Sequence, residues 1–432
     1  MDASIWLGLY PQAGNAEYML HQAEKEDNPA MKGIALILKT LVMSNIVDTY
    51  GNVPYFDALK IALQKDTLNY TTRYDDMKLI YADMFALLED ANAAFVKAEE
   101  LKNSGEIPQT DFSALCDYMY EGNVEKWRRL GNSLYLRLLM RAAMKVEEDG
   151  GVMDMSGTEH PDFSIVNKIA ELYDCFNSGS GDYPLMRDRK DAAVVGFSKN
   201  NSALYTPFYA VTSGNWNSVI ACETLVKEMY NTKKGLADPR YYYYLTKPLG
   251  APTQLFKSNL DAFLAKNISA AGNSKVGRYP NGNSGQIGNL KNADRYALMN
   301  YSELLFIFAE AGQRGWLNIS YPVVKKIYLE AVTESALEWN TTESAGSEDM
   351  TKFIGILSDE IEADNALEKI LTQKWVSMFW VGIESWCDYR RTGYPVLKTN
   401  GEAADNNYIL PTRLRYPADE KYRCLLYTSD AA

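Results

Sequence analysis

The stretch VDTYGNVPYFDAL (47–59) predicts where a helix ends and why the chain then turns. Apolar residues precede it at the spacing of one helical face: Ile34, Ile37, Leu41 and Val42. Asn28 and Pro29 favour a helix start, because proline suits the first helical position. Gly51 stops the helix and Pro54 excludes further helix. The sequence therefore predicts a helix over about 29–50 that closes on a turn.

Outward from this stretch, apolar residues recur every three or four positions in several other segments. Further helices are expected at about 76–95, 124–146, 297–311, 321–339 and 365–379. Between about 150 and 290 the chain is instead rich in Gly, Asn, Ser and Pro, which predicts loops with few regular elements. Within that stretch the run YYYY (241–244) is expected to form a partly buried strand.

Composition narrows the function classes. The 432 residues carry a formal charge of -12, which repels polyanions, so no nucleic acid partner is expected. Five dispersed cysteines support neither a disulfide framework nor a zinc site. The longest apolar run, 34–43, is about half of the ~20 residues that a spanning helix needs. The first residues lack the features of a secretory signal, so the chain is expected to be cytoplasmic or to lack its true N-terminus.

The chain offers little for catalysis. It contains two histidines, no Walker-type GK[ST] loop and no GxGxxG motif, so no cofactor, metal or nucleotide site is expected. Two carboxylate pairs could serve glycosidic hydrolysis, since spacing in sequence does not reveal their separation in space. These pairs are Glu303 with Glu310, and Glu384 with Asp388, beside Arg390 and Arg391. The preferred interpretation is buried ion pairs that fix helix ends, so no catalytic residue is predicted.

Two polar segments of the middle region contain aromatic residues suited to a carbohydrate. NNSALYTPFYAVTSGNW (200–216) mixes aromatics with Asn, Ser and Thr, and the stretch 279–286 places Tyr279 beside Asn, Ser and Gln. Sugar faces pack on aromatic rings while their hydroxyls need polar partners. The alternative is that these aromatics anchor a long loop to the core. The predicted ligand-binding residues are Tyr205, Phe208, Tyr209, Asn215, Trp216, Tyr279, Asn283 and Gln286.

A family resemblance joins these observations. The stretch 47–59 is followed in order by YDDMKLIYADMFALLEDANAAF (74–95), YEGNVEKWRRLGNSLYLRLLMRAA (120–143), YALMNYSELLFIFAEAGQRGW (296–316), LTQKWVSMFWVGIESWCDYRRTGYP (371–395) and LPTRLRYPADE (410–420). Together they resemble the SusD/RagB-like outer-membrane nutrient-binding lipoproteins, in the branch where Gln-Lys-Trp precedes a Glu, Trp, Asp and paired-Arg ending. These motifs lie on helices that must pack, so Trp127, Trp375, Trp386, Arg390 and Arg391 are expected in the core or in polar networks.

The resemblance implies an all-α fold of tetratricopeptide-like helix pairs, an α–α superhelix, with an irregular lobe and few short strands. It implies one SusD-like domain over 1–432, with a helical scaffold at about 16–148 and 295–392 and a ligand-binding lobe at about 150–294. The ending 423–432 does not resemble the family and is treated as an atypical tail.

The resemblance also implies a function. Such proteins bind an oligosaccharide or a peptide at the cell surface, without catalysis, and deliver it to a SusC-like TonB-dependent barrel in the outer membrane. Membrane contact is expected only through a lipid anchor, which this chain does not contain. Two other functions stay open: a glycoside hydrolase on a helical scaffold, and a helical-repeat protein-interaction module.

Overall fold

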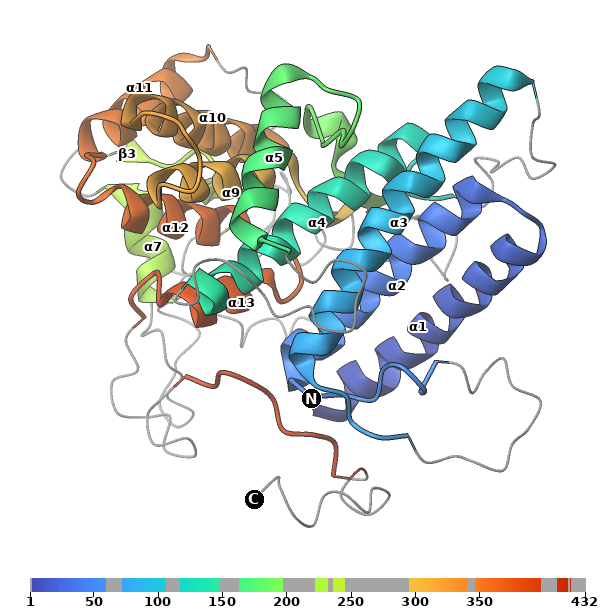
Figure 1. Ribbon diagram of the computed structural model, residues 1–432. Helices are drawn as coiled ribbons and strands as arrows, with labels where there is room; N and C mark the ends of the chain where they lie inside the picture. Colours follow the sequence, from blue (N-terminus) through green and yellow to red (C-terminus); the bar gives the residue numbers. More distant parts are fainter. Residues whose placement is uncertain are drawn as a thin grey trace. The chain divides into compact units, whose positions relative to one another are not determined.

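The computed structural model describes residues 2–59, 72–105, 117–147, 163–196, 222–231, 236–244, 295–339, 346–397, 410–418 and 420 (Figure 1). The chain forms two compact units. Unit 1 contains Met1–Met186 and Pro411–Ala432, and unit 2 contains Arg187–Leu410.

Unit 1 is a series of long helices in which each helix packs against the next. Its helices are α1 (Asp2–Lys25), α2 (Pro29–Tyr50), α3 (Met77–Ser104), α4 (Val124–Glu147) and α5 (Ile165–Ser178). The first four lie side by side in Figure 1. Short connections such as the one between α1 and α2 make neighbouring helices antiparallel, which buries the apolar face of each against its partner.

Helix α2 is the centre of unit 1, because α1, α3 and α4 all contact it. Asn28 caps its start by accepting a hydrogen bond from the backbone N–H of Met31 at 3.0 Å. Two glycines let neighbouring helices approach closely. A Cβ at Gly33 would lie 2.7 Å from the Phe95 ring, and one at Gly131 of α4 would lie 2.7 Å from Ile37.

Length and composition would also allow α2 to span a membrane, since it has 22 residues and a mean hydropathy of 1.5 in its most apolar window. No other helix among the described residues meets these criteria. In this structure 61% of that window is buried inside the protein. The hydrophobicity of α2 is therefore used for packing against the other helices of unit 1.

The described residues of unit 2 form a helical core and two small sheets. Its helices are η2 (Arg189–Asp191), α7 (Glu223–Met229), α8 (Tyr241–Tyr244), α9 (Tyr301–Gln313), α10 (Tyr321–Trp339), α11 (Glu348–Glu360), α12 (Ala366–Ser377) and α13 (Glu384–Thr392). Its strands are β1 (Ala193–Gly196), β2 (Tyr230–Asn231), β3 (Leu236–Ala237) and β4 (Arg295–Met299). Strand β1 pairs antiparallel with β4, and β2 pairs antiparallel with β3. Helix α9 is buried along nearly its whole length and packs against α10 and α12.

The mainly helical fold class is confirmed, and most helix predictions are close to the observed bounds. Two local predictions are wrong. The expected helix 297–311 begins instead with β4, because this stretch pairs with β1, and α9 starts at Tyr301. The run 241–244 forms one helical turn instead of a strand. A turn places its first and fourth residues on one face, and Tyr241 and Tyr244 are both buried in the core, at 1% and 0% exposure.

Candidate functional site

The eight predicted ligand-binding residues all lie in two stretches, 197–221 and 245–294, that fall outside the described residues. Their roles therefore stay predictions. The described residues do define how the chain leaves the helical core before these stretches and how it returns after them.

The β1–β4 pair holds the two ends of this part of the chain together. Gly196, the last residue of β1, is opposite Arg295, the first residue of β4. Everything between them, 197–294, therefore begins and ends at the same place in unit 2. The antiparallel ladder fixes this base through its backbone hydrogen bonds.

The chain is fastened to the core a second time, at 222–244. There α7 and α8 pack with α12 into a buried cluster made by Leu225, Val226, Met229, Tyr241, Tyr244 and Val376. The ring of Tyr244 stacks on Phe379 with centroids 4.2 Å apart and an interplanar angle of 12°. It also meets Trp339 edge-on at 4.9 Å. Aromatic packing of this kind gives the attachment a defined orientation.

Arg240 is the polar centre of this second attachment, and its side chain is fully buried. Its Nη2 donates to Asp238 Oδ2 at 2.6 Å and to Gln373 Oε1 of α12 at 2.5 Å. Its Nη1 donates to Ser335 Oγ of α10 at 3.0 Å. Burial alone would lower the pKa of Arg240, but the Asp238 carboxylate raises it, so the guanidinium stays charged. One side chain thus joins the Asp-Pro-Arg turn to two core helices.

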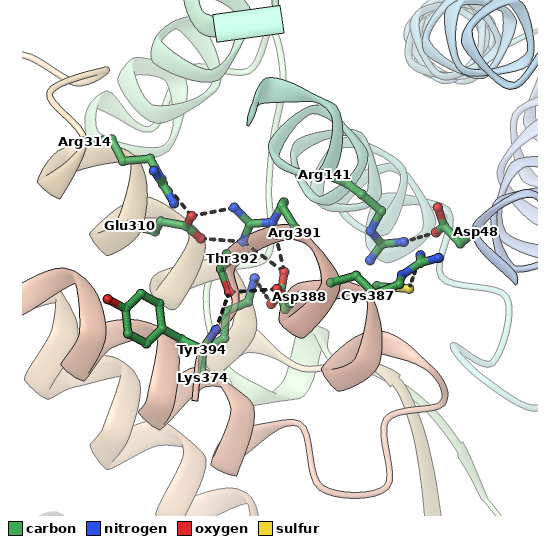
Figure 2. Close-up of polar contacts among 11 residues, drawn as sticks. Asp48, Arg141, Glu310, Arg314, Lys374, Cys387, Asp388, Arg391, Thr392 and Tyr394 are labelled. Carbon is green, nitrogen blue, oxygen red and sulfur yellow. Dashed lines mark hydrogen bonds and ion pairs between the residues drawn. The ribbon is translucent and has the colours of Figure 1, made fainter. Parts of the chain in front are cut away.

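Two of the four carboxylates considered for catalysis, Glu310 and Asp388, are held in ion pairs (Figure 2). Glu310 is completely buried and receives two hydrogen bonds from Arg391, at 2.5 and 2.7 Å, and one from Arg314 at 2.9 Å. Asp388 pairs with Lys374 at 2.6 Å and with Arg391 at 2.9 Å. For Glu310 and Asp388 the interpretation as buried ion pairs is confirmed.

The protonation of Glu310 follows from these partners. Burial alone would raise its pKa, but the charge and hydrogen bonds of Arg391, together with the charge of Lys374, lower it. Glu310 is therefore an ionised structural group. A general acid would need the opposite shift, toward a raised pKa. Glu303 and Glu384 are buried as well, at 1% and 6% exposure, on the first turns of α9 and α13.

The motif 371–395 thus works as scaffold. Gln373 binds Arg240, Lys374 binds Asp388, and Arg391 binds Glu310 of α9. The guanidinium of Arg390 lies over the Trp386 ring, 4.1 Å from its centroid. In unit 1, Trp127 is buried at 5% exposure. The expectation that the recognisable motif residues serve packing and polar networks agrees with these contacts.

The stretch 47–59 is held by groups from two other parts of unit 1. Asp75 Oδ2 accepts hydrogen bonds from the backbone N–H of Tyr55 and of Phe56, both at 2.9 Å. The terminal segment 410–420 lies against the same turn, where Tyr416 Oη donates to the Asn52 carbonyl at 2.6 Å. The Tyr416 ring stacks on Tyr50 with centroids 6.1 Å apart. The first and the last of the six quoted motifs therefore meet in space.

No group of three or more metal-ligating side chains exists among the described residues. Among the cysteines that the structure describes, Cys175 and Cys387 are buried. A shallow pocket of about 360 Å³ lies between the end of α1, the start of α2 and α3. Four of its charged lining residues are paired, Lys97 with Asp27 at 3.3 Å and Lys32 with Glu24 at 3.9 Å.

Comparison with known families agrees with this arrangement. Residues 1–417 match the SusD-like family described as starch-binding and associating with the outer membrane. The chain belongs to the SusD-like family. This is a family of non-catalytic nutrient-binding proteins, and it is associated with the outer membrane. No match is found among proteins with curated functions.

Solved structures show the same fold. A SusD homologue from Bacteroides fragilis matches with a TM-score of 0.73 and 22% identity, over 98% of this SusD-like chain and 85% of that chain. A homologue from Bacteroides uniformis matches with a TM-score of 0.71 and 22% identity, over 98% and 81% of the two chains. A chitin-binding SusD homologue from Flavobacterium johnsoniae matches with a TM-score of 0.69 and 21% identity, over 98% and 82%.

Sequence reasoning missed Arg240, which this SusD-like chain uses to fasten 222–244. An available signal was the Asp-Pro-Arg sequence directly before an aromatic run. A charged residue beside several core aromatics must find a partner when it is buried. The predicted strand at 241–244 gave Arg240 no role, because it began after this residue.

Proposed function

We propose that this SusD-like protein binds an oligosaccharide at the cell surface, does not cleave it, and delivers it to a SusC-like TonB-dependent transporter. The match of 1–417 to a family described as starch-binding carries the proposal. The relative from Flavobacterium johnsoniae, described as chitin-binding, favours glycans as the ligand class. Starch and chitin fragments are therefore the first ligands to test.

The proposed site consists of the predicted residues in 197–221 and 245–294. Tyr205, Phe208, Tyr209, Trp216 and Tyr279 would stack on sugar rings, and the amides Asn215, Asn283 and Gln286 would bind hydroxyls. Each stacking contact contributes roughly 0.5–1.5 kcal/mol beyond burial. Several such contacts give an affinity that still allows release to a transporter.

Calorimetry with malto-oligosaccharides, chito-oligosaccharides and short peptides tests the ligand class. We expect one glycan series to bind, and Trp216→Ala to lower its affinity about three- to tenfold. Tyr118→Ala is the control, because Tyr118 is an exposed aromatic of unit 1, 60% accessible, outside the proposed site. Unchanged affinity in Trp216→Ala would contradict the proposed site. Binding of peptides and of no glycan would contradict the proposed ligand class.

The absence of cleavage and the delivery step have separate tests. Prolonged incubation with a bound glycan should release no new reducing ends, because Glu310 and Asp388 are held in ion pairs. Sustained release of reducing ends would instead favour the alternative function, a glycoside hydrolase. Co-purification from the native membrane should yield a TonB-dependent barrel protein, and its consistent absence would contradict delivery to such a partner.

A further inference from the structure

Two stretches, 197–221 and 245–294, carry the proposed ligand residues. Both are attached to unit 2 through the segment 222–244, of which the structure describes 222–231 and 236–244. The first runs from β1 to α7, and the second runs from α8 to β4. Because β1 and β4 are paired, the outer ends of the two stretches share one base. Their inner ends share the segment 222–244.

The Asp-Pro-Arg turn of segment 222–244 makes polar contacts with the helical core through Arg240. The Asp-Pro-Arg turn is closed by the Asp238 carboxylate, which accepts from the backbone N–H of Arg240 at 2.8 Å. The Asp238 N–H in turn donates to the Met229 carbonyl at 2.8 Å. The guanidinium then reaches Ser335 and Gln373 on α10 and α12. The fork of Arg240 therefore fixes the turn to these helices, together with the packing of Tyr241 and Tyr244.

We infer that Arg240 is a positioning residue for ligand binding, which holds the inner ends of both ligand-carrying stretches on α10 and α12. The inference rests on the proposed function. A ligand that contacts both stretches gains affinity when their ends are fixed, because less conformational entropy is lost on binding. Arg240 acts through the segment that it fastens and not through contact with the sugar.

The experiment that tests this inference compares the same substitution, arginine to lysine, at two positions of unit 2. Arg240→Lys keeps the charge but loses the planar fork that reaches Asp238, Ser335 and Gln373 at once. Arg391→Lys is the control, because Arg391 is also a buried arginine, 5% exposed, whose carboxylate partners lie on α9 and α13. Both variants are destabilised, but only the first loosens 222–244.

We expect Arg240→Lys to weaken binding of the best glycan about tenfold or more, and Arg391→Lys to stay within about twofold of wild type. Amide hydrogen exchange in 222–244 should accelerate in Arg240→Lys and stay unchanged in Arg391→Lys. If Arg240→Lys does not fold, Ser335→Ala replaces it, since this change removes one partner of the guanidinium and leaves the charge pair.

Several results would overturn the inference. The first is an unchanged glycan affinity in Arg240→Lys, or in Ser335→Ala where that variant replaces it. The second is an equal loss of glycan affinity in Arg240→Lys and Arg391→Lys. A wild-type protein that binds no glycan would instead overturn the proposed function, and the ligand-positioning role with it. The two failures are distinguishable because the first occurs with a wild-type protein that binds.

Discussion

Asp117 of unit 1 and Glu310 of unit 2 are both buried carboxylates, at 9% and 0% exposure, but they bind different kinds of donor. Asp117 accepts from backbone N–H groups of Met119, Tyr120 and Gly122, each at 3.0 Å, and from Trp127 Nε1 at 2.8 Å. All of these donors lie within ten positions along the chain. Glu310 binds Arg314 nearby and Arg391, which is 81 positions away.

The difference separates two uses of buried charge. Asp117 fixes a local turn before α4, and its donors are mostly neutral backbone groups. Glu310 ties α9 to α13 through two cations, so its loss or the loss of a partner affects tertiary packing. Removing one member of a buried ion pair leaves an uncompensated charge, which is more costly than losing neutral hydrogen bonds.

The largest expected effect is that of Arg391→Met. It leaves Glu310 without its bidentate partner, so we expect the free energy of unfolding to fall by about 3–5 kcal/mol. Urea titration monitored by circular dichroism measures this free energy of unfolding. Arg390→Met is the control: its guanidinium stacks on Trp386, and its removal should cost about 1 kcal/mol. Equal losses in the two variants would contradict the special role of the Glu310 pair.

A smaller loss is expected for Asp117→Asn. The amide group would face N–H donors in place of a carboxylate oxygen, which should cost about 1–3 kcal/mol. Asp76→Asn is the matched control, because Asp76 caps α3 by accepting from Lys78 N–H at 2.7 Å and asparagine caps helices equally well. Urea unfolding should therefore separate the two variants, and equal stability of both would show that Asp117 is not needed for its turn.

Backbone conformation gives a third, local test in unit 1. Gly51 has φ of 85° and ψ of -122°, a region that other residues rarely adopt, so Gly51→Ala should cost about 1–3 kcal/mol. A Cβ there would meet only Arg413, at 3.9 Å, so the cost comes from the backbone. Gly14→Ala in α1 should instead stabilise by about 0.5–1 kcal/mol, because nothing lies within 4 Å of its Cβ position. Thermal unfolding that moves both variants in the same direction would refute this reasoning.

The smallest effects concern pH, and two carboxyls of unit 1 should respond with opposite signs. Burial would raise the pKa of Asp117, but the hydrogen bonds from Tyr120 and Trp127 lower it below its ordinary value. Its contribution to stability is therefore present above about pH 4 and is lost as the pH falls through that lowered pKa. The difference between wild type and Asp117→Asn should narrow on acidification.

Asp83 should show the reverse. Burial raises its pKa, although the Tyr55 hydrogen bond and the charge of Lys39 oppose this. Its contribution is present below about pH 4 and is lost as the pH rises through the raised pKa. Asp83→Asn should therefore gain stability relative to wild type as the pH rises above 4. Parallel unfolding curves from pH 3 to 8 test both signs, and a pH-independent difference for either variant would contradict its assignment.

Much of the helical core could be predicted from particular residues. The Asn28-Pro29 start and the Gly51 stop agree with the bounds of α2, and the repeat after Asp76 agrees with the start of α3. These signals are local, because capping and helical periodicity act over a few residues. The errors fell where a distant partner decides the structure: β4 is a strand because β1 pairs with it.

The candidate site could be predicted less well. Aromatic residues among amides indicate a sugar-binding chemistry, but they do not indicate which rings share a surface. Arg240 was missed because its partners Ser335 and Gln373 are 95 and 133 positions away. A sequence pattern carries no information about contacts at that separation.

The sequence by itself determined the helical class, the ends of several helices and the family, because each depends on local spacing or on ordered motifs. Only the tertiary structure decided the use of the charged motif residues. Glu310, Asp388 and Arg391 became one ion-pair network because burial leaves each charge stable only beside an opposite one. For the same reason the charge of Arg240 is held beside Asp238, where it helps to attach the middle of the chain to the helical core.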